Sequence, residues 1–195
     1  MKRRAFLQKA IPAAVTGGLL MGCRSESTAP AVITQPRVDW RLASSFPRSL
    51  DTLFGAGEFL AKRVAELTDG RFTMRPYPAG ELVPGLQVMD AVQQGTVQVG
   101  QTAGYYYTGK HPALAFETTV PFGLTARQQA AWLTRAGGLE LIGEVLADFN
   151  IVPIYGGGTG AQMGGWFRRE IPNLQSLRGL KMRIPGLGGE IMSKL

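Results

Sequence analysis

Hydrophobic and polar residues follow strand and helix periods in the first part of the chain. Alternation over residues 38–42 predicts a half-buried strand. Apolar residues then recur at steps of three and four over residues 50–67, which predicts an amphipathic helix with Ser49 as its N-cap. Residues Phe72–Tyr77 predict a second strand, and Pro76 restricts it to an edge or an end of a sheet. The opening unit is therefore predicted to be β-α-β.

The rest of the chain continues this alternation. Three further stretches have helical periodicity: residues 86–94, 125–148 (interrupted at Gly137-Gly138) and 188–195. Three more have strand-like patterns: residues 97–99, 151–155 and 180–184. Strands that alternate with helices predict an α/β fold with a parallel sheet. The last helix begins at Gly188 and reaches Leu195 without a cap, which predicts a truncated reading frame.

The first 23 residues have the pattern of an export signal. A basic start, Lys2-Arg3-Arg4, precedes an apolar run over residues 10–21, which is too short for a stable membrane-spanning helix. Arg3-Arg4 followed by Ala5-Phe6-Leu7 resembles a twin-arginine signal. The protein is therefore expected to work outside the cytoplasm.

The single cysteine closes this signal. Leu20-Met21-Gly22-Cys23 resembles a lipobox, which would make Cys23 the lipid-modified first residue of the mature protein and a membrane tether. The alternative is ordinary cleavage near residues 29–31, with Cys23 discarded. Residues 24–36 are small, polar or proline, a composition that suits a flexible linker.

The charge of the mature chain argues against nucleic acid. The formal charge of +7 includes Lys2, Arg3, Arg4 and Lys9; without them 17 basic and 14 acidic residues leave +3. No helix or face concentrates basic residues as nucleic-acid binders do. A mild basic excess does suit a small anionic ligand.

Enzyme motifs are weak or absent. The chain has no Gly-x-Ser-x-Gly, and its sole histidine, His111, precedes a proline as loop residues do. Metal sites built on His and Cys are excluded by their number. The glycine-rich stretch from Gly156 to Gly165 has some likeness to a dinucleotide loop, but the residues after it are poor helix formers. An exported cofactor-binding enzyme that uses this stretch is the alternative hypothesis.

Three groups are candidates for ligand contact. Gln162 stands among glycines, where its side chain can reach into a cleft. Arg183 alternates with apolar residues: it is either solvent-facing or a clamp for a carboxylate, which guanidinium binds through two parallel hydrogen bonds. Tyr105, Tyr106 and Tyr107 follow a predicted strand, where they either cover a core edge or line a cleft.

Five segments together resemble the solute-binding proteins of TRAP (tripartite ATP-independent periplasmic) transporters. They are residues 47–51 (PRSLD), 80–87 (GELVPGLQ), 90–96 (DAVQQGT), 159–168 (TGAQMGGWFR) and 177–183 (LRGLKMR). The resemblance runs from about Trp40 to Leu195 and is strongest to the branch that binds 2-oxo acids or lactate together with a cation.

This resemblance implies a receptor without catalytic activity or catalytic cofactor. It implies two α/β lobes around a cleft, transfer of the ligand to integral membrane subunits, and a homodimer in the full-length protein. Arg183 matches the arginine that pairs with the substrate carboxylate, and Gln162 matches a residue that touches the ligand and a bound cation, Na⁺ or Ca²⁺. The remaining cation ligands are expected beyond Leu195.

The predicted organisation has four parts: the signal over residues 1–23, the linker over 24–36, lobe I over 37–157, and a crossing segment with the incomplete start of lobe II over 158–195. The residues leave open the carbon length of the acid, the choice between oxo and hydroxy acids, and the identity of the cation.

Overall fold

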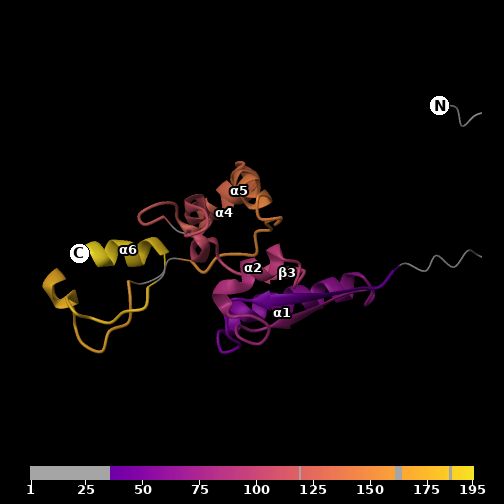
Figure 1. Ribbon diagram of the computed structural model, residues 1–195, viewed down its shortest axis with the longest axis horizontal. Helices are drawn as coiled ribbons and strands as arrows, with labels where there is room; N and C mark the ends of the chain where they lie inside the picture. Colours follow the sequence, from indigo (N-terminus) through magenta and orange to yellow (C-terminus); the bar gives the residue numbers. More distant parts are fainter. Residues whose placement is uncertain (1–35, 119, 161–163, 185) are drawn as a thin grey trace, which may run out of the picture. The chain divides into compact units, whose positions relative to one another are not determined.

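A computed structural model describes residues 36–118, 120–160, 164–184 and 186–195. The predicted signal, most of the linker, Cys23 and Gln162 lie outside these described residues. In chain order the strands and helices are β1 (Val38–Ser44), α1 (Asp51–Leu67), β2 (Phe72–Tyr77), η1 (Gly85–Gln87), α2 (Val88–Gln93), β3 (Val99–Gln101), η2 (Gly104–Tyr107), η3 (Pro112–Leu114), α3 (Ala115–Thr118), α4 (Ala126–Arg135), α5 (Gly138–Ala147), η4 (Leu174–Leu177) and α6 (Gly186–Lys194). Figure 1 labels α1, α2, β3, α4, α5 and α6.

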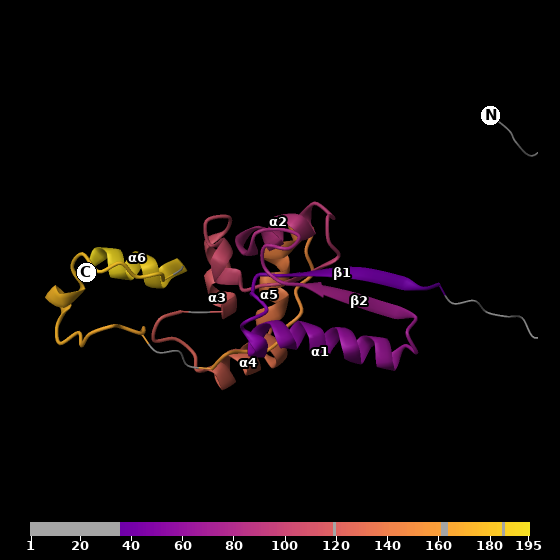
Figure 2. The same ribbon diagram turned by 90° about the horizontal axis from the view of Figure 1, so that it is seen from below.

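A parallel three-stranded sheet in the order β2-β1-β3 confirms the predicted α/β fold. The central strand β1 places Leu42 opposite Pro76 on β2 and Val99 on β3. Since β2 is an edge strand, Pro76 sits where a missing N–H is tolerated, as predicted. Figure 2 shows α1 running beside β1 and β2, which completes the β-α-β unit.

The start of α1 corrects one prediction. Leu50, not Ser49, is the N-cap residue, and it makes no side-chain hydrogen bond to the helix. The backbone N–H of Phe54 instead donates to the Leu50 carbonyl, and the Thr52 N–H donates to the Asp51 carboxylate at 2.7 Å. A carboxylate already serves the first turn, so the serine hydroxyl is not needed there.

Two clusters of apolar side chains form the core. One joins the buried end of β1 to α2 and the start of β3, through Ala43, Val88, Ala91 and Val97. The other joins α2 to the helices that follow β3, through Met89, Tyr107, Leu114, Ile142 and Leu146. Since Met89 in the second cluster lies between Val88 and Ala91 on α2, that helix links the sheet to the helical layer.

The predicted interruption of the long helical stretch is confirmed as the junction of α4 and α5. Gly137 adopts φ +81° as the N-cap of α5, a left-handed conformation that favours glycine. A Cβ at Gly138 would lie 2.5 Å from the Trp132 ring, so the two helices pack closely only because position 138 has no side chain.

The strands predicted at residues 151–155 and 180–184 are not formed in the described residues, whose ladders join only β1, β2 and β3. The alternation itself is present: Ile151 and Pro153 are half-buried, whereas Val152 and Ile154 are exposed. A pattern of this kind specifies two faces but does not supply a neighbouring strand. The predicted final helix is confirmed as α6, which begins two residues early, at Gly186.

None of the helices in the described parts of the chain is long and apolar enough to cross a membrane.

Candidate functional site

The three tyrosines lie directly after the carboxyl end of β3, where they form the short 3-10 helix η2. Tyr107 is buried, and its hydroxyl accepts a hydrogen bond from the backbone N–H of Met89 at 3.2 Å and lies 2.8 Å from the Thr102 hydroxyl. Tyr107 thus occupies the second core cluster, and its assignment as a ligand residue stays a prediction.

Tyr105 and Tyr106 differ from Tyr107 because both rings are half-buried. Their ring centroids lie 4.5 Å apart at 56°, and their hydroxyls are hydrogen-bonded. Burial raises the pKa of Tyr105 well above its usual range, and the hydrogen bond with Tyr106 acts in the same direction. Tyr105 therefore stays a neutral hydroxyl, and its single proton, which is donated to Tyr106, must turn from Tyr106 to reach an anion.

Arg183, in the segment that precedes α6, acts electrostatically on Tyr105. Its guanidinium lowers the pKa of Tyr105, so it lies close enough to act on that hydroxyl electrostatically. Arg183 and Tyr105, both proposed from the sequence as candidates for ligand contact, thus lie within electrostatic range of each other. Arg183 is exposed and takes part in none of the ion pairs of the described residues, which leaves its fork of donors available.

A glycine lets the Arg183 segment approach the tyrosines. Gly186 adopts φ +59°, and a Cβ there would lie 3.3 Å from the Tyr105 carbonyl oxygen and 3.4 Å from its ring. The first turn of α6 consequently packs on η2. A side chain at position 186 would push α6, and with it Arg183, away from the tyrosine.

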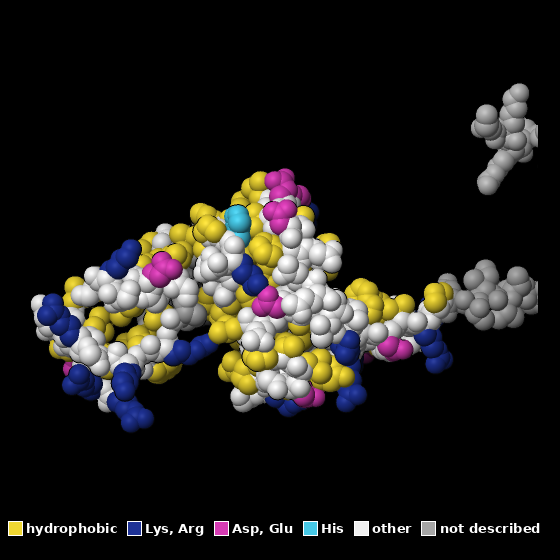
Figure 3. Space-filling view, viewed as in Figure 1, with side chains coloured by type: hydrophobic (Ala, Val, Ile, Leu, Met, Phe, Trp, Pro, Cys, Tyr) yellow, Lys and Arg dark blue, Asp and Glu magenta, His cyan; other side chains and the backbone are white. Residues whose placement is uncertain are grey.

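The segment that contains Arg183 is rich in basic side chains. Residues 164–195 carry six basic side chains and two acidic ones. Figure 3 shows dark-blue Lys and Arg side chains crowded on this part of the surface. The local excess is larger than the +3 of the mature chain as a whole, so an anion would be drawn to this segment.

Gln162 lies outside the described residues, so the structure does not show whether it joins this site. In the described parts of the chain there is no group of three or more His, Cys, Asp or Glu side chains that could hold a metal ion. The chemistry of Arg183 and Tyr105 suits a carboxylate.

The residues that follow the glycine-rich stretch do not begin a helix. No helix begins in residues 164–173, and the next helical turn is η4 at Leu174. A dinucleotide loop needs a helix N-terminus directly after its glycines, and residues 164–173 do not supply one. His111, the sole histidine, is the N-cap of η3, where its Nδ1 accepts the backbone N–H of Ala113 at 3.3 Å.

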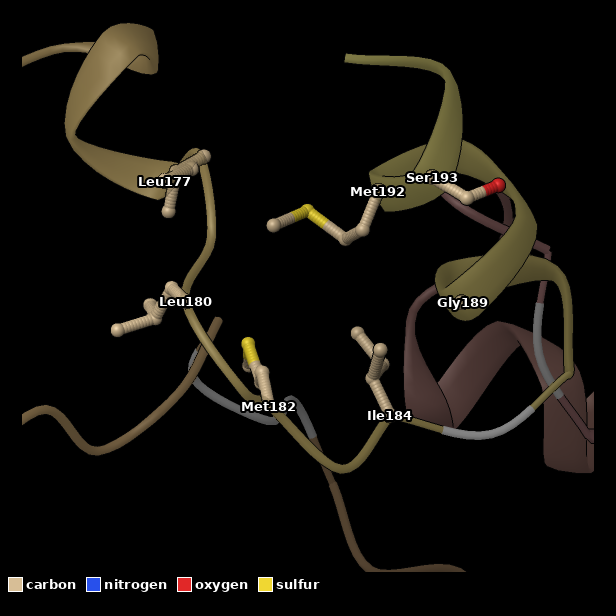
Figure 4. A pocket seen from close by; sticks show the side chains of 7 residues that line it. All are labelled: Leu177, Leu180, Met182, Ile184, Gly189, Met192 and Ser193. Atoms are coloured by element: carbon tan, nitrogen blue, oxygen red, sulfur yellow. The ribbon is translucent and has the colours of Figure 1, made fainter.

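Sequence reasoning missed two features. A cavity of about 290 Å³ lies between residues 177–184 and α6, and Figure 4 shows the side chains of Met182, Ile184 and Met192 directed toward it. Apart from the Ser193 hydroxyl, the side chains that line it are apolar, so none of them can pair with a carboxylate. The second feature is Glu117 on α3, a largely buried carboxyl whose pKa burial raises to about 7. Nothing in the residues around Glu117 indicates that it is buried.

Comparison with known proteins identifies the family. The chain matches the family of bacterial extracellular solute-binding proteins, family 7, over residues 43–195. It is 56% identical to the monocarboxylate 2-oxoacid-binding periplasmic protein of Nostoc sp. (strain PCC 7120), over all of this chain and 53% of that protein.

Two solved structures are similar. The first is a TRAP transporter solute-binding protein from Bordetella bronchiseptica RB50, a mixed-occupancy dimer with copurified calcium and picolinate; it is 49% identical, with a TM-score of 0.79 over 82% of this chain and 48% of that one. The second, from Pseudoalteromonas atlantica T6c with bound sodium and pyruvate, is 44% identical, with a TM-score of 0.76 over 81% of this chain and 48% of that one.

The chain therefore spans about half the length of these relatives. Its parallel sheet and its helices follow the fold of TRAP solute-binding proteins over that half. With a family match over residues 43–195 and this fold, the chain belongs to family 7 of the bacterial extracellular solute-binding proteins, whose solved members include receptors of TRAP transporters.

Proposed function

We propose that this chain is part of an extracytoplasmic receptor for a small organic anion, a 2-oxo acid such as pyruvate, or lactate. The receptor binds the acid together with a cation and delivers it to the membrane subunits of a TRAP-type secondary transporter. The observation that supports the proposal is that Arg183, which takes part in none of the ion pairs of the described residues, lies within electrostatic range of the neutral hydroxyl of Tyr105.

The chemistry of a carboxylate explains why these two groups suit it. A guanidinium binds a carboxylate through two parallel hydrogen bonds, and a tyrosine hydroxyl can add a third. Taking the carboxylate out of water is costly unless these bonds replace its hydration. Since Tyr105 resists ionisation, it adds no competing negative charge, and its proton can pass from Tyr106 to the carboxylate as hydrogen-bond acceptor.

The relatives support the class of ligand. One is named for binding monocarboxylate 2-oxo acids, and another was solved with pyruvate. The cation is proposed on the same ground, because the two solved relatives hold calcium or sodium. Gln162 would contribute an amide oxygen to it, which both ions accept. Among the described residues, no cluster of three or more His, Cys, Asp or Glu side chains could hold the cation.

Export and attachment complete the proposal. The signal over residues 1–23 would carry the chain to the periplasm by the twin-arginine route. Lipidation of Cys23 would then hold the receptor at the membrane that contains its transporter. The receptor would have no enzymatic activity and would form a homodimer at full length.

The test is a thermal-shift titration of the chain with pyruvate, longer 2-oxo acids and lactate, each with sodium, with calcium and with chelator. A ligand that binds the native state raises the unfolding temperature. Arg183→Met should lower pyruvate affinity by about 100-fold or more, because two charge-assisted hydrogen bonds are lost.

Arg178→Met is the matched control, since Arg178 is an exposed arginine of the same segment. It should bind pyruvate as the wild type does. A folded wild-type chain that responds to none of these acids would refute the ligand class. Equal losses in both variants would show that Arg183 contributes only general positive charge.

A further inference from the structure

The first turn of η2 is held by two consecutive side chains of α3. The first N–H groups of a helix have no partner within the helix and need one elsewhere. The Tyr105 N–H donates to the Thr118 hydroxyl at 3.2 Å, and the Gly104 N–H donates to the Glu117 carboxyl group. Two adjacent backbone donors of η2 thus meet two adjacent acceptors of α3.

The contact depends on a glycine. A Cβ at Gly104 would overlap the Glu117 carboxyl group and would lie 2.8 Å from the Leu114 carbonyl oxygen. Gln129 of α4 fixes the other side of α3, because its Nε2 donates to the carbonyl oxygens of Phe116 and Glu117 at 2.7 and 3.0 Å. The backbone of α3 that carries the two acceptor side chains is therefore anchored independently of η2.

The Glu117 carboxyl group is largely buried and takes part in none of the ion pairs of the described residues. The elements packed against α3 are η2, η3 and α5. Their titratable groups, with those of α4, are Tyr105, Tyr106, Tyr107, His111 at the start of η3, Glu140 and Glu144 of α5, and Arg127 and Arg135 of α4. The carboxylates of α5 and the arginines of α4 are exposed.

Burial raises the pKa of Glu117 to about 7, and the hydrogen bond from Gly104 only partly opposes it. The carboxyl group is therefore held more stably in its neutral form. Conformations in which the Glu117 carboxyl group is exposed to water therefore become more favourable as the pH rises through 7. Such conformations would release the Gly104 N–H.

We propose that Glu117 and Thr118 are positioning residues for the ligand site: they hold the backbone of Gly104 and Tyr105 and so keep the Tyr105 side chain within electrostatic range of Arg183. The part played by Tyr105 in binding rests on the proposed function, whereas the two hydrogen bonds between α3 and η2 are a property of the free chain. Ligand affinity is then linked to protonation through Glu117, and it falls as the pH rises through 7.

The test measures amide exchange of Gly104 and Tyr105 by NMR in the full chain, corrected for intrinsic rates. Glu117→Ala should speed exchange at Gly104, and Thr118→Val at Tyr105, each on the order of tenfold, the effect of one lost hydrogen bond. Glu117→Gln should restore protection because its amide oxygen accepts the same bond. Glu140→Ala and Thr134→Val, at exposed positions of α5 and α4, should change neither amide.

A pH series separates positioning from a merely structural role. Protection of Gly104 in the wild type should fall between pH 6 and pH 8, and pyruvate affinity should fall with it, whereas Glu117→Gln should show neither change. Unchanged exchange in Glu117→Ala and Thr118→Val overturns the proposal. If Glu117→Ala does not fold, the pH response of the wild type against Glu117→Gln decides.

Two further outcomes distinguish this inference from the proposed function. Faster exchange with unchanged pyruvate affinity would overturn the role in ligand binding. A wild type that binds no acid, yet shows the expected exchange pattern, would refute the proposed ligand and support the two hydrogen bonds by which α3 positions η2.

Discussion

Glu117 links the stability of the chain to pH through a single side chain. Its pKa is about 7 in the folded chain, against an ordinary value of 4.5. A raised folded pKa means that the folded state binds the proton more tightly than the unfolded state does. The resulting stabilisation is fully present below pH 4.5 and is lost as the pH rises through 7. Across the range from pH 4.5 to pH 7, the free energy of unfolding changes through Glu117 by on the order of 3 kcal/mol at most.

The prediction is that Glu117→Gln removes this dependence. The free energy of unfolding of the wild type should fall more steeply between pH 5 and pH 8 than that of the variant, as measured by urea denaturation. Glu140→Gln changes an exposed carboxylate of α5 in the same way and should follow the wild type. Parallel curves for all three proteins would show that the Glu117 carboxyl group is hydrated in the folded chain.

Residues of the candidate site differ in how far the sequence could predict them. Arg183 and Tyr105 carry recognisable chemistry, and they lie within electrostatic range of each other. Three consecutive tyrosines cannot be assigned to faces until the helix that contains them is known, so the sequence does not distinguish buried Tyr107 from half-buried Tyr105 and Tyr106. Glu117 could not be predicted, because its burial is produced by the packing of η2 and α3 and not by its neighbours in sequence.

At the scale of single elements, α4 shows how a helix start is fixed locally. The Thr125 hydroxyl accepts the Gln128 N–H at 3.4 Å, and the Gln128 side chain accepts the Thr125 N–H at 2.9 Å. This reciprocal capping box satisfies donors that the helix cannot. Thr125→Ala should therefore lower the free energy of unfolding by about 1 kcal/mol.

The control for this cap is Thr134→Ala on the same helix. The Thr134 hydroxyl donates only to the carbonyl of Ala130, one turn earlier. Alanine has the higher helix propensity, so this change should leave the stability equal or raise it by a few tenths of a kcal/mol. Urea denaturation of both variants measures the difference. Equal losses would mean that the hydroxyl of Thr125 is not acting as a cap.

Helices were predicted more completely than strands because their hydrogen bonds are local. The periodicity of residues 50–67 and 125–148 is satisfied within each helix, so a pattern in the sequence is sufficient. A strand also needs a neighbour. Residues 38–42 and 72–77 find each other in β1 and β2, whereas residues 151–155 have the alternation without a partner among the described residues.

At the scale of the whole molecule, residues 151–155 present apolar side chains on both faces. The side chain of Ile151 packs against the second core cluster. Val152 and Ile154 point the other way and are 86% and 87% exposed. Strands that are apolar on both faces are typical of buried positions in parallel sheets. An outward apolar face of this kind is a surface through which chains associate.

The last prediction is that this face drives self-association of the chain. Replacing Val152 and Ile154 together by lysine should shift the chain toward monomer, as measured by light scattering over a range of concentrations, because two large apolar side chains leave the contact. The control double variant replaces Phe59 and Leu67 of α1, which are 65% and 73% exposed, by lysine. If the α1 variant alone becomes monomeric, the contact lies on α1. If the mass of the Val152 and Ile154 variant stays that of the wild type, the outward face of residues 151–155 takes no part in association.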